Sequence, residues 1–84
     1  GSWGAIYEQL PCDEEGNVVR GDAEAAIHDA RGCLVSATKS GKIIALVGVE
    51  DLVVIDTEDA VLVCPRNRDQ DVKKITQIIE KRRS

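Results

Sequence analysis

The most constraining feature of the chain is a tandem pattern in residues 48–65, GVEDLVVIDTEDAVLVCP. Two consecutive units of eight residues each open with an acidic pair and continue with four apolar residues; the pairs are Glu50-Asp51 and Glu58-Asp59. Short apolar runs rich in β-branched residues and bounded by polar residues are typical of strands that are buried on most of their surface. Polar corners this short permit either tight hairpins or the successive sides of a β-solenoid coil.

The acidic pairs have a structural and a catalytic interpretation. At a corner, an Asp side chain can hydrogen-bond to the local backbone, and its charge keeps the turn in water. Paired carboxylates also perform acid–base catalysis in enzymes. Nothing near these pairs in the sequence supplies a positioned nucleophile, a cation or a substrate-binding group, so we favour the structural interpretation.

Three apolar runs in the second half of the chain are predicted to be strands. They are KIIALVGV (42–49), LVVID (52–56) and AVLVC (60–64), and short polar corners separate them. Their inward side chains are expected to supply much of the core. The core residues predicted from these runs are Ile44, Leu46, Val53, Ile55, Val61 and Val63.

Helices are predicted at both ends. The segment WGAIYEQL (3–10) carries apolar residues at helical spacing, and Pro11 ends it. In RNRDQDVKKITQIIEKRRS (66–84), Asp69 is the expected N-cap, with acidic residues in the first turn and basic residues in the last. One apolar stripe on this helix is expected to pack on the sheet of residues 42–64. The stripe consists of Val72, Ile75, Ile78 and Ile79.

The segment between the first helix and the apolar runs gives weaker signals. A turn is expected at residues 15–17, a short extended piece at Val18-Val19, and another turn at Ser40-Gly41. Residues 23–36 begin with AEAAIHDA, which favours a helix, and continue with strand-like residues. Pattern alone leaves the structure of this segment open.

Length and composition indicate one small domain. The chain has 84 residues with one Trp, one Tyr and no Phe, so its core must be built from Val, Ile, Leu and Ala. The net charge of −4 argues against a nucleic-acid partner, because phosphate backbones attract a surplus of Lys and Arg. No apolar run approaches the roughly 20 residues of a membrane span. Because the chain has no Met, we expect it to be a piece of a longer, cytoplasmic protein.

Few residues in the sequence are candidates for catalytic groups or metal ligands. The cysteines Cys12, Cys33 and Cys64 lie far apart and, with His28, give no spacing typical of a zinc site, so reduced thiols are expected. His28 next to Asp29 could be a polarised base, but no Ser or Cys partner is evident. No phosphate-binding or hydrolase motif is present. On these grounds the chain is predicted to be a non-catalytic module with no catalytic, cofactor-binding or metal-binding residue of its own.

Three stretches in order resemble the C-terminal part of bacterial mannose-1-phosphate guanylyltransferases, a family of sugar-phosphate nucleotidyltransferases. They are GSWGAIYEQLP, DEEGNVVRGD and LVGVEDLVVIDTEDAVLVCPRNRDQDVKKI, and together they cover nearly the whole chain. The resemblance implies a mainly β fold with flanking helices: a short left-handed β-helix-like (β-solenoid) domain with a C-terminal amphipathic helix. It implies a division into the last helix of a missing catalytic domain (1–11), the β-helix-like domain (12–65) and the C-terminal helix (66–84).

The resemblance also implies a function. The parent enzyme would make GDP-mannose and pyrophosphate from GTP and mannose 1-phosphate, with Mg²⁺ held outside this chain. This chain would be its non-catalytic assembly domain, in contact with the missing N-terminal catalytic domain and with other copies in a homo-oligomer. The residues expected at those contacts are Trp3, Ile6, Tyr7, Val72, Ile75 and Ile79. The alternative is a self-sufficient small β-module that binds a sugar nucleotide or a protein partner.

Overall fold

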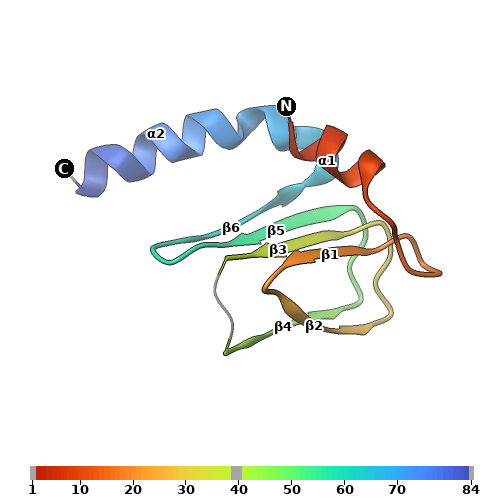
Figure 1. Ribbon diagram of the computed structural model, residues 1–84. Helices are drawn as coiled ribbons and strands as arrows, with labels where there is room; N and C mark the ends of the chain where they lie inside the picture. The colour runs from red at the N-terminus through yellow and green to blue at the C-terminus, as the bar shows by residue number, and fades with distance from the viewer. Residues whose placement is uncertain (1, 39–40, 84) are drawn as a thin grey trace.

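The computed structural model describes residues 2–38 and 41–83, and the described chain is mainly β with a helix near each end (Figure 1). The predicted turn at Ser40-Gly41 lies partly outside the described residues. The strands are β1 (Val18–Gly21), β2 (Glu24–His28), β3 (Leu34–Ala37), β4 (Ile43–Val47), β5 (Leu52–Asp56) and β6 (Val61–Pro65). The helices are α1 (Trp3–Gln9), the 3-10 helix η1 (Arg66–Asp71) and α2 (Val72–Arg83).

The strands form two sheets. Sheet A has the order β1-β3-β5-β6, and sheet B consists of β2 and β4 (Figure 1). From β1 to β5 the chain alternates between the sheets, and the neighbours in each sheet are parallel. At β6 the chain reverses, and β6 pairs with β5 in antiparallel fashion. A hairpin thus joins β5 to β6, one of the two connections that the sequence left open, and the earlier strands are linked by corners between the two sheets.

Two corners between the sheets stack on each other with matching backbone. Asp29 and Gly32 in the first corner have positive φ angles of 58° and 67°, and Gly48 and Asp51 in the second have 63° and 56°. The Gly48 amide donates to the His28 carbonyl at 3.0 Å, which aligns the corners. A Cβ at Gly32 would press on the Asp51 carboxylate, and the positive φ would strain any other residue, so Gly is favoured there. The undecided segment 23–36 is thus a strand, a corner and most of a second strand.

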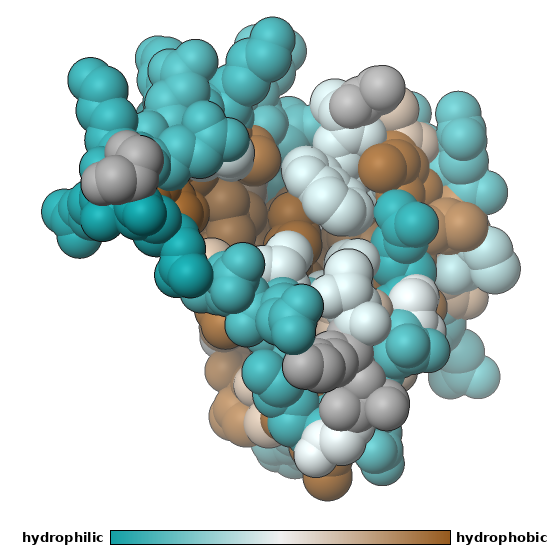
Figure 2. Space-filling model, turned by 60° about the vertical axis from the view of Figure 1, so that its left-hand side comes forward, coloured by the Kyte–Doolittle hydropathy of each residue, from teal (hydrophilic) through white to brown (hydrophobic). Residues whose placement is uncertain are grey.

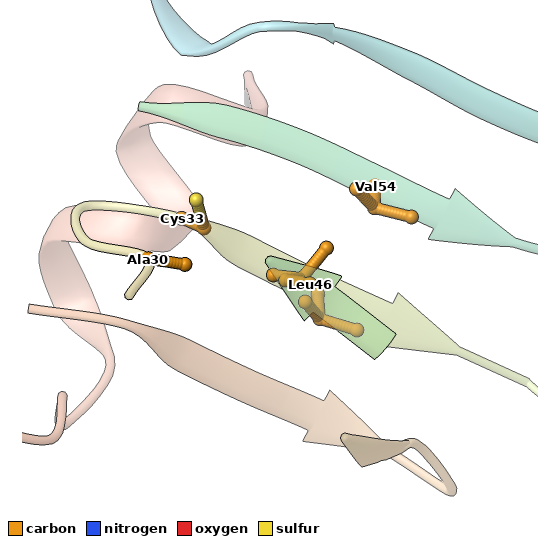
Figure 3. Close-up of a cluster of buried hydrophobic side chains, with 5 residues drawn as sticks. Ala30, Cys33, Leu46 and Val54 are labelled. Atoms are coloured by element: carbon orange, nitrogen blue, oxygen red, sulfur yellow. The ribbon is translucent and has the colours of Figure 1, made fainter. Parts of the chain in front are cut away.

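The core has two parts, one on each face of sheet A. The first lies between the sheets, where Leu46 of β4 meets Val54 of β5 (Figure 3). Its buried members are Ala30, Cys33, Val35, Leu46 and Val54. The second lies on the other face of sheet A, under α1, and consists of Val18, Leu34, Val53 and Ile55 with partly buried Trp3, Tyr7, Leu10, Leu62 and Cys64. Sheet A is therefore the middle layer of the molecule.

The predicted core is right for β5 and wrong for β6. Val53, Ile55 and Leu46 are buried, and Ile44 is partly buried. Val61 and Val63, by contrast, are 63% and 59% exposed. Val63 lies opposite Val54 of β5, so it faces the side of sheet B. Among the described residues sheet B has only two strands, and neither extends beneath β6.

The C-terminal helix also differs from the prediction. The chain turns helical at Arg66 and passes through η1, whose Arg68 has the non-helical angles φ −112° and ψ 18°, before α2 begins at Val72. Asp69 therefore lies inside η1 and is not the N-cap of α2, whose first turn has no acidic residue. The basic last turn is confirmed. No residue of α2 is buried, so the stripe does not close against the sheet.

Candidate assembly surface

Helix α1 is anchored to η1 at its N-terminus. The Ser2 hydroxyl caps the helix by accepting from the Ala5 amide at 3.2 Å. The Asp69 carboxylate, which comes from the far end of the chain, accepts from the Gly4 amide at 2.7 Å. A Cβ at Gly4 would lie 2.9 Å from the same carboxylate oxygen, so Gly lets the two segments approach. A carboxylate at a helix N-terminus is also favoured by the helix dipole.

Two aromatic side chains of α1 attach it to the β-domain. The Tyr7 hydroxyl donates to the Gly16 carbonyl at 2.5 Å, and the Arg66 guanidinium lies 4.1 Å from the centre of the Tyr7 ring. The Arg20 guanidinium lies 5.8 Å from the centre of the Trp3 ring. Both aromatic residues thus have partners within the chain, and α1 is part of the folded unit.

An apolar groove separates α2 from sheet A and α1. It has a volume of about 720 Å³, and its apolar lining comes from three segments. These apolar residues are Trp3, Ile55, Leu62, Val72 and Ile79, with Asp59, Glu80 and Arg83 among its charged residues. Figure 2 shows a hollow with a hydrophobic floor beside the hydrophilic surface of α2. The groove exists because α2 lies along sheet A without burying any residue.

A second groove, of about 410 Å³, lies between β6 and α2. Val61, Val63 and Ile75 contribute to its lining, and Ile75 is 40% exposed. Burial, with a further contribution from Asp69, raises the pKa of the Cys64 thiol at this groove. The two grooves flank α2, which leaves an apolar surface on both sides of the helix.

The residues expected at contacts fall into three groups. Trp3, Val72 and Ile79 line the larger groove, and Val72 and Ile79 also line the smaller one with Ile75. Tyr7 lies instead near the corner, beside Arg66 and Asp51. Ile6 is partly buried on α1 and belongs to the lining of neither groove. The structure therefore brings four of the six residues together at the grooves.

The corner carboxylates have arginine partners. Arg31 Nε lies 3.5 Å from Glu50, Arg66 lies 3.4 Å from Asp51, and Arg83 lies 3.6 Å from Asp59. The Arg66 amide also donates to the Asp51 carbonyl at 2.6 Å. These contacts connect corners to neighbouring segments, which agrees with the structural interpretation of the acidic pairs.

One carboxylate is buried. The Asp56 side chain is 4% exposed, and the half-exposed Lys42 ammonium lies 3.1 Å from its Oδ2 and 3.3 Å from its Oδ1. Only the contact to Oδ1 has hydrogen-bond geometry, so Oδ2 is held by charge alone. This pair links the residue before β4 to the last residue of β5.

Potential catalytic groups are scattered. Cys12, Cys33 and Cys64 carry free thiols, and only Cys33 is buried. His28 and Asp29 are exposed at the end of β2. Within the described ranges, no three His, Cys, Asp or Glu side chains gather in a way that could hold a metal ion. None of the described helices has the length and apolar character to cross a bilayer.

Asn17 is the structural residue that the sequence pattern missed. Its side chain is buried, donates to the Ala30 carbonyl at 2.9 Å and accepts from the Cys33 amide at 3.0 Å. It therefore joins the loop before β1 to the first corner. In the sequence Asn17 follows Gly16 and resembles an ordinary turn residue, so only a fold-level expectation of stacked corners could have singled it out.

The fold and these surfaces define a small two-sheet β-domain with flanking helices and exposed apolar grooves. Comparison with protein families specifies it further. The chain belongs to the MannoseP isomerase/GMP-like beta-helix domain family, whose model matches residues 16–79.

Individual relatives agree with this membership. The chain is 45% identical over 80 residues to the mannose-1-phosphate guanylyltransferase of Klebsiella pneumoniae, covering 95% of this chain and 16% of that protein. It is 38% identical over 80 residues to the alginate biosynthesis protein AlgA of Pseudomonas aeruginosa, with the same coverage. The chain thus spans 16% of the length of these curated relatives.

A solved structure has the same fold. It is described as mannose-1-phosphate geranyltransferase from Thermus thermophilus, and it superposes with a TM-score of 0.82 at 32% identity. The match covers 94% of this chain and 23% of the Thermus chain.

Proposed function

We propose that this chain is the non-catalytic C-terminal assembly domain of a mannose-1-phosphate guanylyltransferase. The observation that carries the proposal is that nearly the whole chain matches a small share of such enzymes and folds with free apolar grooves. The parent enzyme would convert GTP and mannose 1-phosphate to GDP-mannose and pyrophosphate in the cytoplasm. Its Mg²⁺ and its reacting groups would belong to the catalytic domain.

The finer description of the fold is part of the proposal. Alternation of strands between two parallel-paired sheets, together with the family's name, supports a short left-handed β-helix. In the proposed division, residues 12–65 form the β-helix-like domain, 66–84 the C-terminal helix, and 1–11 the end of the catalytic domain. The Gly4–Asp69 hydrogen bond would then fix the catalytic domain's last helix to the C-terminal segment.

The grooves beside α2 are the proposed contact sites. A catalytic domain or a second subunit that covered them would bury Ile75, which is 40% exposed and lines the smaller groove. Exposed apolar surface of this kind is normally covered by a partner. Trp3, Val72 and Ile79 would contribute from the groove walls, while Tyr7 would hold α1 in place. Ile6, partly buried on α1, remains a proposed contact residue outside the grooves.

Calorimetric titration tests the non-catalytic role. We expect no heat of binding when the chain is titrated with GTP and Mg²⁺, mannose 1-phosphate or GDP-mannose, because the described residues offer no phosphate cradle. Micromolar binding of any of these would overturn the proposal and favour the sugar-nucleotide module.

A second experiment tests the contact sites. The remaining part of the Klebsiella relative, expressed separately, should bind the chain, and Ile75→Glu should weaken that binding. Lys74→Glu is the matched control, because Lys74 is exposed on the same helix. Equal affinities for the two variants would count against the grooves.

A further inference from the structure

The outer face of sheet B is apolar and uncovered. Side chains alternate along its strands, so Glu24, Ala26 and His28 of β2 and Ile43, Ala45 and Val47 of β4 are exposed together. Ile43 is 62% exposed and Val47 is 68% exposed, although no helix of the described chain lies on this face (Figure 1). Parallel sheets are usually covered on both faces. These six residues therefore form a candidate interaction surface that is separate from the grooves beside α2.

The strand register organises this face. Parallel pairing places Glu24 beside Ile43, Ala26 beside Ala45, and His28 beside Val47. The β2 side thus carries a carboxylate at one end and an imidazole at the other, while the β4 side is apolar at both ends. The alanines at the centre leave room for a second flat surface to approach.

We propose that this face binds the same face of a second copy of the chain. The twofold axis lies in the interface, perpendicular to the strands, so that β2 stacks on β2 in the opposite direction. Glu24 of each copy then meets His28 of the other, and the imidazole N–H donates to the carboxylate. Ile43 of each copy meets Val47 of the other. The face is therefore complementary to itself in both charge and apolar character.

The charge pattern selects this arrangement over its alternative. A twofold axis parallel to the strands would stack β2 on β4, and Glu24 would face Ile43 of the other copy. That geometry removes a carboxylate from water without supplying a partner, which is unfavourable. A perpendicular axis avoids this loss.

The face is small, so the association is weak. Stable dimers bury roughly 800 Å² on each partner, more than six side chains on two five-residue strands provide. We expect a dissociation constant of about 100 μM or above. In a longer protein, such a contact would add to the contacts at α2, because linked contacts strengthen each other.

Sedimentation equilibrium of the chain, from about 20 μM to about 1 mM to span the expected constant, tests the proposal. Val47→Lys should raise the dissociation constant about tenfold, because it places an ammonium against an apolar residue in both halves of the dimer. Val19→Lys is the matched control, since Val19 is 43% exposed but lies on β1, outside sheet B and outside the lining of both grooves. A chain that stays monomeric throughout, or an equal loss in the two variants, would overturn the proposal.

Exchanging the charges at positions 24 and 28 tests the direction of the proposed twofold axis. Glu24→Lys should weaken association about tenfold, because two identical pairs are lost in each dimer. Adding His28→Glu to that variant should restore association to within about twofold, since the exchanged charges pair again. Circular dichroism establishes that each variant is folded. A double variant that stays as weak as Glu24→Lys would refute the perpendicular axis.

Discussion

Replacement of Asn17 by Ala should destabilise the chain strongly, although Asn17 belongs to a loop. The side chain is 3% exposed and satisfies two backbone groups of the first corner, the Ala30 carbonyl and the Cys33 amide. Cys33 is fully buried, so water cannot easily replace the lost acceptor. The variant therefore leaves a buried donor and a buried acceptor without partners.

The expected magnitude follows from these two groups. A buried polar group left unpaired costs about 1–3 kcal/mol, so two such groups should together cost about 2–6 kcal/mol. The total stability of a small domain is only about 5–10 kcal/mol. At about 4–8 °C for each kcal/mol, the melting temperature should fall by at least about 8 °C.

Thermal unfolding followed by circular dichroism measures this effect. Asn67→Ala is the control, because Asn67 is exposed in η1 and its replacement should change stability by less than about 0.5 kcal/mol. Asn17→Asp should also destabilise the chain, because it keeps the acceptor for the Cys33 amide but sets a buried carboxylate against the Ala30 carbonyl and the Asp13 carboxylate. If Asn17→Ala melted as the control does, the corner would not depend on this side chain.

Three further changes have definite expected results. Lys42→Met should lower the free energy of unfolding, measured in urea, by about 1–2 kcal/mol, because the buried Asp56 carboxylate loses its partner. The loss is limited because water screens the half-exposed ammonium. An unchanged free energy of unfolding would contradict this prediction. Gly32→Ala should lower the free energy of unfolding by about 1–3 kcal/mol, because φ is +67° and the added methyl group would press on the Asp51 carboxylate. Gly48→Ala should lower the free energy of unfolding less, because φ is +63° but the space around Gly48 is open. Cys64 should react with iodoacetamide more slowly than exposed Cys12 near pH 8, because burial raises the pKa of the Cys64 thiol. The raised pKa also makes stability depend on pH. The free energy of unfolding is highest below the pKa of Cys64 in the unfolded chain and falls as the pH rises through its pKa in the folded chain.

The sequence predicted the elements with the strongest local patterns. Strand β5 was predicted with its observed limits of 52 and 56, because four consecutive apolar residues stand between polar corners. Helix α1 was predicted within a residue of its observed end. Segment 24–28 was undecided, because its alanines favour a helix in isolation. Parallel pairing with β4 decides in favour of a strand, and no local pattern shows that pairing.

The candidate site was less predictable than the strands. The α2 stripe was found from its spacing, but the prediction that it packs on the sheet was wrong, because helix direction depends on the kink at Arg68. The Asp69 contact to Gly4 joins residues 65 positions apart, so it follows only from the fold. Exposure of Val61 likewise depends on the different widths of the two sheets, which hydropathy does not encode.

The reversal of direction at β6 has a consequence for polymerisation. A stack of parallel strands offers the same hydrogen-bonding edge after every addition, so in principle it can template further chains as a fibril does. Here the turn from Thr57 to Ala60, closed by a 2.9 Å backbone hydrogen bond, folds the chain's own β6 onto the exposed edge of β5. Pro65, at the end of β6, has no amide to offer a further strand. The hairpin thus blocks the addition of a further parallel strand to β5.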